Sequence, residues 1–219
     1  MIEKPHSPSC DRNRDPILDV LRMHFSDRRH VLEIGSGTGQ HAVHFAAEMP
    51  WLTWQCSDGE AYLPGVRMWL DEAALPNTPV PFALQAVAEP SPHFAPQPVP
   101  VPRDVVNGHA GYDAVFSANT LHIMGWPEVE AMFASLPTLL ADDATVAVYG
   151  PFNIDGEFTS ESNRQFEGWL KARDPRSGIR DLEAVDALAA AIGLHLVADI
   201  PMPANNRMLV WQRGTITPN

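Results

Sequence analysis

The chain has 219 residues, of which 45% are hydrophobic, and its 15 Lys and Arg against 27 Asp and Glu give a formal net charge of −12. This acidic surplus disfavours binding to the phosphate backbone of a nucleic acid, so we expect no nucleic-acid partner. No apolar run reaches the length of a membrane span and no charged-then-apolar leader opens the chain, so we expect one cytoplasmic domain, residues 1–219, with no membrane partner.

Helical and strand patterns alternate along the first part of the chain, which is typical of a sheet with helices on both faces. Asp15 followed by Pro16 predicts the start of a helix, and residues 1–28 are expected to form an N-terminal lid and helix. The apolar periodicity then predicts a strand at 31–34, a helix at 42–49, a strand at 51–58, a helix at 64–75 and a strand at 81–87.

The segment "EPSPHFAPQPVPVPR" has alternating prolines that exclude a helix interior and a central strand. It predicts a stiff loop within an insertion at 89–110. Beyond it, the patterns predict strands at 112–119, 144–150, 194–200 and 207–213, and helices from Pro127 and at 161–172 and 182–192. Asp181 is the expected N-cap of the last helix, and Gly193 its stop.

The stretch "VLEIGSGTGQH" joins a predicted strand to a predicted helix through Gly35, Gly37 and Gly39. Three glycines can simply form a tight turn, but at this position of an α/β fold the backbone must approach a ligand closely. The dinucleotide pattern G-x-G-x-x-G fails because its third glycine is replaced by Gln40. A nicotinamide oxidoreductase is therefore disfavoured.

With Glu33 included, the stretch reads E-x-G-x-G-x-G and resembles the first motif of class I S-adenosylmethionine-dependent methyltransferases. The resemblance implies that Glu33 faces the ammonium group of S-adenosylmethionine, directly or through water. Asp58 ends the second strand, where a ribose-hydroxyl acceptor is expected, although NAD-binding proteins share this feature. The expected cofactor-binding residues are Glu33, Gly35, Ser36, Gly37, Gly39, Gln40, His41, Asp58, Gln85 and Asn119.

Several segments together resemble one group of these methyltransferases, the domain-of-unknown-function family 938, related to animal methyltransferase-like protein 26. The matching segments are "DRNRDPIL", "VLEIGSGTGQHAVHFA", "YDAVFSANTLHIMGW", "YGPFNIDGEFTSESN", "RDPRSGIRDLEAV" and "MPANNRMLVW". The resemblance implies an α/β fold with a Rossmann-like seven-stranded sheet, helices on both faces and an antiparallel last strand. At residues 85–87 the chain departs from class I relatives, which often place an Asp near the adenine amino group there. Gln85 or the backbone is expected to replace that Asp.

Methyl transfer from a sulfonium is an in-line displacement, in which alignment and desolvation matter more than a protein nucleophile. The catalytic candidates are His122, which follows the fourth main strand, and Tyr149 at the end of the fifth. His122 is either a general base or a histidine that bonds its local turn, and Tyr149 either forms an acceptor wall or belongs to the core. His41 and His44 lack further ligands nearby, and Cys10 and Cys56 lack metal spacing, so we expect no metal site.

The candidates for binding the methyl acceptor are six polar residues, Arg12, Asn13, Asn163, Arg173, Arg180 and Asn205, and the aromatic Phe152. The structural alternatives are a frayed terminus for Arg12 and Asn13, core packing for Phe152, pairing with Asp174 or Asp181 for the arginines, and a hairpin turn for Asn205. The strand-end motif "SANT" differs from the N-P-P-[YF] loop of methyltransferases that act on base nitrogens. The sequence thus predicts a methyltransferase for a small or medium-sized molecule. An S-adenosylmethionine-binding protein without transferase activity is the alternative, and monomer and homodimer both stay open.

Overall fold

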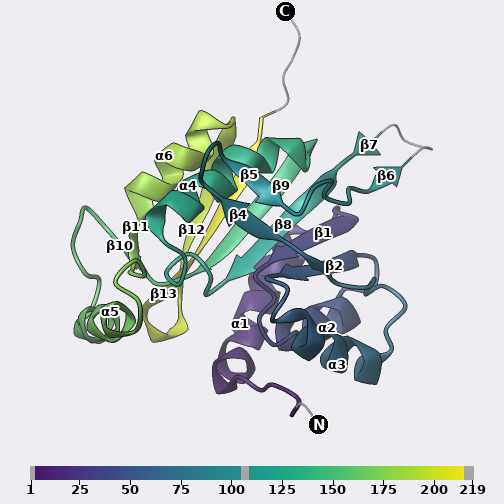
Figure 1. Ribbon diagram of the computed structural model, residues 1–219, viewed down its shortest axis with the longest axis horizontal. Coiled ribbons are helices and arrows are strands. Elements are labelled where there is room, and N and C mark those ends of the chain that lie inside the picture. The colour runs from purple at the N-terminus through teal and green to yellow at the C-terminus, as the bar shows by residue number, and fades with distance from the viewer. Residues whose placement is uncertain (1–2, 105–108, 215–219) are drawn as a thin grey trace, which may run out of the picture.

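A seven-stranded sheet forms the centre of the computed structural model, which describes residues 3–104 and 109–214 (Figure 1). Its strands, in spatial order, are β12 (Leu194–Met202), β13 (Asn206–Arg213), β9 (Leu140–Gly150), β8 (Tyr112–Ala118), β1 (His30–Ile34), β2 (Thr53–Asp58) and β3 (Phe82–Ala83). β13 runs antiparallel to both of its neighbours, whereas β9, β8, β1, β2 and β3 pair in parallel. This confirms the predicted Rossmann-like α/β sheet with an antiparallel last strand.

Helices cover both faces of the sheet and bury two hydrophobic layers (Figure 1). On one face pack α1 (Pro8–His24), α2 (Gln40–Glu48) and α3 (Leu63–Ala73), and on the other α4 (Trp126–Ser135) and α6 (Leu182–Ala191). Alternate residues of β1 divide between the layers, because Val31 packs on the α1 side and Leu32 on the α4 side. α5 (Glu161–Arg173) lies beside the β12–β13 connection, where the Asn163 Nδ2 donates to the Asn205 carbonyl over 3.1 Å.

The first helix begins at Pro8, so the predicted helix start at Asp15 is wrong. Pro16 lies inside α1, where it removes one helical hydrogen bond. Gln40 of α2 holds the start of α1, the part that precedes Pro16. The Ser7 amide donates to the Gln40 Oε1 over 2.6 Å, and the Gln40 Nε2 donates to the Asp11 Oδ1 over 3.2 Å. These contacts between distant residues outweigh the local Asp-Pro signal.

The predicted strand at 81–87 is divided at the buried Leu84, which corrects that prediction. β3 ends before Leu84, and β4 (Gln85–Val87) pairs antiparallel with β5 (His93–Ala95) in a separate two-stranded sheet. The predicted stiff loop at 89–103 therefore contains a strand, because the run "HFA" between Pro92 and Pro96 is free of proline and can form a ladder.

Beyond the proline-rich run, β6 (Arg103–Asp104) pairs antiparallel with β7 (His109–Ala110), and residues 105–108 of the predicted insertion lie outside the described residues. Shorter elements complete the chain: η1 (Leu136–Thr138), β10 (Phe152–Asn153), β11 (Arg180–Asp181) and η2 (Pro203–Asn205). Asp181 occupies the N-cap of α6 and Gly193 follows its C-cap with φ +80°, as predicted. Within 3–104 and 109–214, no helix combines the length and the apolar character needed to cross a bilayer.

Candidate functional site

The turn between β1 and α2 is fixed to the second strand by its backbone. The amides of Gly35 and Ser36 both donate to the Ser57 carbonyl over 3.0 Å, and Gly35 has φ +77°. A Cβ on Gly35 would lie 2.5 Å from the Oγ1 of Thr120, which belongs to the loop after β8. Only glycine fits here, because the position combines a left-handed backbone with a close neighbour.

Glu33 lies beneath this turn, on the α1–α3 side of the sheet, and is 2% exposed. Its Oε2 accepts hydrogen bonds from the Ser36 Oγ over 2.9 Å and from the Trp54 Nε1 over 3.1 Å. Burial raises the pKa of this carboxyl to about 7, although those hydrogen bonds oppose the shift. Glu33 therefore braces the turn from inside the core.

Asp58, the last residue of β2, connects the turn to the neighbouring loop. Its Oδ2 accepts from the Gly37 amide over 2.6 Å, and its Oδ1 from the Gly59 amide over 2.7 Å. Burial raises the pKa of Asp58, and the two amide hydrogen bonds oppose that rise. Each carboxylate oxygen keeps a further lone pair for a ligand.

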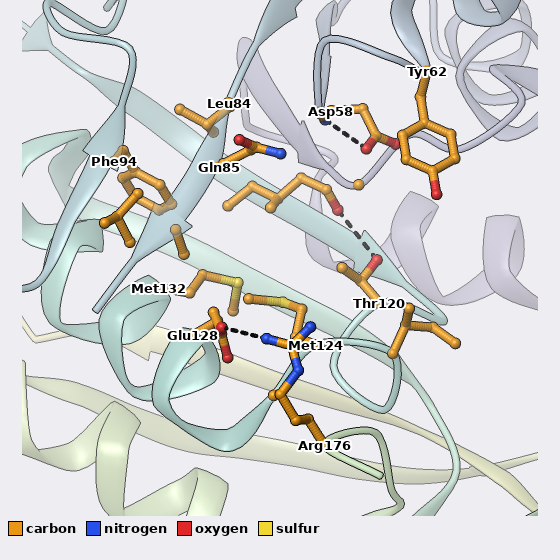
Figure 2. A pocket seen from close by; sticks show the side chains of 17 residues that line it. Asp58, Tyr62, Leu84, Gln85, Phe94, Thr120, Met124, Glu128, Met132 and Arg176 are labelled. Atoms are coloured by element: carbon orange, nitrogen blue, oxygen red, sulfur yellow. Dashed lines mark hydrogen bonds and ion pairs between the residues drawn. The ribbon is translucent and has the colours of Figure 1, made fainter. Parts of the chain in front are cut away.

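A cavity of about 360 Å³ opens at the carboxyl ends of β1, β2 and β8 (Figure 2). Gly35, Asp58 and Gln85 are the expected cofactor residues that line it together. One wall is apolar and comes from the β3–β5 segment, the loop before α4 and α4 itself, with Leu84, Phe94, Met124 and Met132. The rim includes the exposed Tyr62 and the ion pair between Glu128 and Arg176. A polar end beside an apolar slot suits a ligand with a hydroxylated part and a flat apolar part.

The other expected cofactor residues lie around the turn. Gln40 and His41 are buried in the first turn of α2, where Gln40 bonds the start of α1. Asn119 follows β8 with φ +57°, and its amide donates to the Tyr149 carbonyl over 2.8 Å. Gly39, with φ +90°, is the N-cap of α2.

Three of the expected residues form a buried polar cluster on the α1 side of the sheet. The Nε2 of His41 lies 2.8 Å from the Oδ1 of Asn13, and burial lowers the pKa of His41 to about 4. Burial also raises the pKa of Tyr149, while hydrogen bonds with Asn13 and Asn206 oppose the rise. Asn13 is thus a packed helix residue, whereas Arg12 is exposed and donates to the Ser9 Oγ over 3.1 Å.

His122 lies in the loop after β8 and is 5% exposed. Burial, with a smaller contribution from the charge of Arg180, lowers its pKa to about 4. Its ring packs edge-on against Phe166 of α5 at a centroid distance of 5.3 Å. Arg180 donates to the carbonyls of Leu121, Met124 and Arg176, so its guanidinium holds this loop in shape.

The remaining acceptor candidates do not line the cavity. Arg173 is exposed and its guanidinium stacks on Trp169 at 4.6 Å. Asn163 is buried beneath Asn205, and the Nδ2 of Asn205 donates to the Ser162 Oγ over 3.0 Å. Phe152 is 1% exposed and belongs to the α4-side core. The described residues contain no group of three or more His, Cys, Asp and Glu side chains that could hold a metal ion.

The sequence did not reveal most of the residues that line the cavity, among them Tyr62, Thr120, Glu128 and Met132. Thr120 ends the "SANT" motif, so its position after a strand was a usable signal. Glu128 and Met132 are four residues apart on α4 and share one of its faces, but helical periodicity does not reveal which ligand a face meets.

Solved methyltransferases share this fold. The chain is similar to an O-methyltransferase family protein from Burkholderia thailandensis, with a TM-score of 0.71 and 16% identity over 92% of this chain and 56% of that one. The S-adenosylmethionine-dependent methyltransferase SibL matches with a TM-score of 0.70 and 18% identity over 94% of this chain and 55% of its own.

A third similar structure is N,N-8-amino-8-demethyl-D-riboflavin dimethyltransferase from Streptomyces davawensis, with a TM-score of 0.69 and 16% identity over 94% of this chain and 55% of that one. The chain thus spans about half the length of the solved structures it matches. The model of the family described as protein of unknown function (DUF938) matches residues 4–213, so the chain belongs to that family.

Proposed function

We propose that this chain is an S-adenosylmethionine-dependent methyltransferase that acts on a small or medium-sized molecule by in-line methyl transfer. The observation that carries the proposal is the cavity that Gly35 and Asp58 line together, at the carboxyl edge of a methyltransferase-like sheet. Ligands of open α/β sheets collect at this edge.

The residues around the cavity fit the cofactor. Gly35 lets the backbone come close to the ligand, and the free lone pairs of Asp58 suit the two ribose hydroxyls. Leu84, Phe94 and Met132 offer an apolar slot for a base. When bound, S-adenosylmethionine supplies a methyl group that its sulfonium has already activated.

Glu33 has a different role in this proposal from the contact with the ammonium group that its motif suggests. Its carboxyl bonds Ser36 and Trp54 inside the core, so it supports the turn that holds the cofactor's amino-acid tail. Ser36 in turn accepts from the Ser57 amide over 3.2 Å, which fastens the turn to β2. Glu33 is therefore a positioning residue in this proposal.

His122 is the proposed general base for acceptors that must lose a proton. Its depressed pKa, about 4, keeps the imidazole neutral at pH 7, but an imidazole with so low a pKa is a weak base, so the role depends on a pKa that rises when the acceptor binds. The cluster of Asn13, His41 and Tyr149 is proposed to border the acceptor, with Arg12, Phe152, Asn163, Arg173, Arg180 and Asn205 farther out. The following stay predictions: these residue roles, a cytoplasmic location, the lack of a nucleic-acid partner and the relation to methyltransferase-like protein 26.

The small-molecule acceptor is supported by the neighbours named above, one of which acts on an amino-riboflavin by its name. The test has two steps. Calorimetric titration with S-adenosylmethionine, S-adenosylhomocysteine and NAD should give binding of the first two and none of NAD. A screen of hydroxylated and aminated aromatic metabolites should then release S-adenosylhomocysteine. Binding of NAD alone contradicts the proposal, and binding without turnover favours a cofactor-binding protein.

A further inference from the structure

The two halves of α1 are held to the rest of the protein in different ways. In the second half, Ile17 and Leu21 are fully buried in the core between the sheet and the helices. Among residues 8–15, all of which the structure describes, Asn13 alone is buried, and its side chain is polar. Segments with few buried apolar contacts open more readily than the core. The first half of α1 can therefore move away while the second half stays packed.

Pro16 lies between these two halves. It has no amide hydrogen, so the carbonyl of Arg12 loses its helical partner. The helical conformation is also disfavoured for the residue before a proline, which weakens the helix at Asp15. Sharp bends in helices concentrate at such positions. α1 thus contains a point at which its first half can turn relative to its second.

Polar contacts with α2 and the glycine turn fasten the first half of α1. The Oε1 of Gln40 accepts from the Ser7 amide over 2.6 Å and from the Thr38 hydroxyl over 3.0 Å, so one side chain joins the start of α1 to the turn. One helical turn before Pro16, the Oδ1 of Asn13 lies 2.8 Å from the Nε2 of His41. Single hydrogen bonds of this kind are modest in strength, so they can break and re-form without unfolding the core.

The chain before α1 is fastened to α3. The Nε1 of Trp69 donates to the Pro5 carbonyl over 2.7 Å, and the Nζ of Lys4 lies 3.6 Å from the centroid of the Trp69 ring. A Cβ on Gly65 would lie 2.6 Å from the Cγ of Pro5, so the glycine makes room for this contact. Residues 4–15, which we call the N-terminal strap, therefore run from α3 past the first turn of α2 to the packed half of α1 (Figure 1).

The N-terminal strap covers part of the glycine turn. Cys10 is half-buried, and burial raises the pKa of its thiol, while hydrogen bonds with Ser7 and Thr38 oppose that rise. Gly35 lines the cavity, whereas Thr38 and Gln40 do not. The covered residues belong to the turn that holds the cofactor's amino-acid tail in the proposed function. A tail bound at this part of the turn can enter or leave only when the strap moves.

We propose that the N-terminal strap is a gate that pivots at Pro16, and that its opening limits how fast a nucleoside with an amino-acid tail enters and leaves the site. The opening itself rests on the contacts above, whereas its effect on the nucleoside rests on the proposed function. The closed strap keeps water from the covered part of the turn and retains the ligand. Opening leaves the packed half of α1 in place, so exchange of the ligand does not require unfolding.

Cys10 reports the opening in the ligand-free protein, because the other cysteine, Cys56, is fully buried. The rate at which monobromobimane modifies Cys10 follows the open population. Trp69→Phe keeps an aromatic ring and removes the donor to Pro5, so it should raise this rate roughly threefold to tenfold, the effect of one lost hydrogen bond. Asn13→Ala should act in the same direction.

Pro16→Ala should have the opposite effect. Alanine restores an amide that can donate to the Arg12 carbonyl, so modification of Cys10 should slow at least about threefold. Asp19→Ala, on the exposed face of the packed half of α1, is the control and should leave the rate unchanged. Equal rates in the wild type, Trp69→Phe and Pro16→Ala would overturn the gate. A wild-type rate as high as in the urea-unfolded chain would overturn it as well.

S-adenosylhomocysteine links the gate to the site. At about ten times its Kd it should slow modification of Cys10 roughly tenfold, and Trp69→Phe should speed its release, followed by stopped-flow displacement, by the factor found for Cys10. Calorimetric binding without protection of Cys10 would overturn the effect on the nucleoside and leave the proposed function intact. If the ligand does not bind, the proposed function and that effect both fail, and the ligand-free rates still decide whether the strap opens.

Discussion

The amide of Gly37 donates to the Oδ2 of Asp58 over 2.6 Å, which joins the glycine turn to the end of the second strand. The other carboxylate oxygen accepts from Gly59 over 2.7 Å. Asp58 thus shapes two loops of the cavity and still offers lone pairs to a ligand. A substitution here acts on both the loops and the ligand, so the two effects need separate measurements.

Asp58→Asn should weaken binding of S-adenosylhomocysteine by about 1.5–3 kcal/mol, the worth of hydrogen bonds to a charged group. The loss arises because an amide replaces one acceptor oxygen with a donor. Calorimetry measures the affinity, and thermal unfolding shows whether the loops persist. Asp71→Asn, on the exposed surface of α3, is the matched control. Unchanged affinity in a folded Asp58→Asn would disprove the ribose assignment.

Gly35→Ala and Gly156→Ala form a matched pair, because both glycines have a left-handed backbone, with φ +77° and +74°. Nothing lies within 4 Å of a Cβ at Gly156, whereas at Gly35 it meets Thr120. Backbone strain of roughly 1–2 kcal/mol applies to both, and overpacking adds about 1–3 kcal/mol only at Gly35. Urea unfolding should show this difference, and only Gly35→Ala should lose nucleoside binding. Equal destabilisation would mean that Thr120 simply moves aside.

Glu33→Gln should stabilise the protein more at pH 8 than at pH 5. The folded pKa of Glu33 is raised from 4.5 to about 7, so the folded state disfavours the charged form and loses stability as the pH rises from 4.5 to 7. The loss is on the order of 3 kcal/mol, and a neutral amide avoids it. Denaturation at the two pH values checks this, with the exposed Glu60→Gln as control. If Glu33→Gln raised the free energy of unfolding equally at both pH values, the carboxyl of Glu33 would titrate normally.

His122→Ala should lower turnover by about 10²–10⁴-fold while leaving nucleoside affinity unchanged, as expected for a general base. Because its pKa is about 4, the activity profile should show no inflection from His122 near pH 6.5. His195→Ala, exposed on β12, is the control. Surviving turnover would leave His122 as a packing partner of Phe166 only.

The main sheet and the glycine turn were predictable because local patterns specify them. Alternating or continuous apolar runs predict β1, β2 and β8, and a glycine turn between a strand and a helix has few structural alternatives. The start of α1 was not predictable, because Gln40 fixes it from 33 residues away. The division at Leu84 was hidden for a similar reason: β4 leaves the sheet to pair with β5.

The cavity could be predicted only in part. Gly35 and Asp58 lie where parallel strands end, so topology alone brings them together. Gln85 was expected from the resemblance to class I methyltransferases, and it does line the cavity. Glu128 was missed because α4 reaches the cavity through packing against β4 and β5, which no local pattern reveals. His122 and Tyr149 were predicted from strand ends, yet their surroundings depend on Phe166 and Asn13, which are far away in sequence.

The hairpin of β4 and β5 lies outside the main sheet and rests on α4. One end of the cavity is therefore built by the sheet, and the other by the hairpin and α4. These two parts can change independently during evolution or engineering. Under the proposed function, substitutions at the hairpin and α4 should alter the apolar wall of the cavity, while the end around Asp58 and the core beneath it keep their structure.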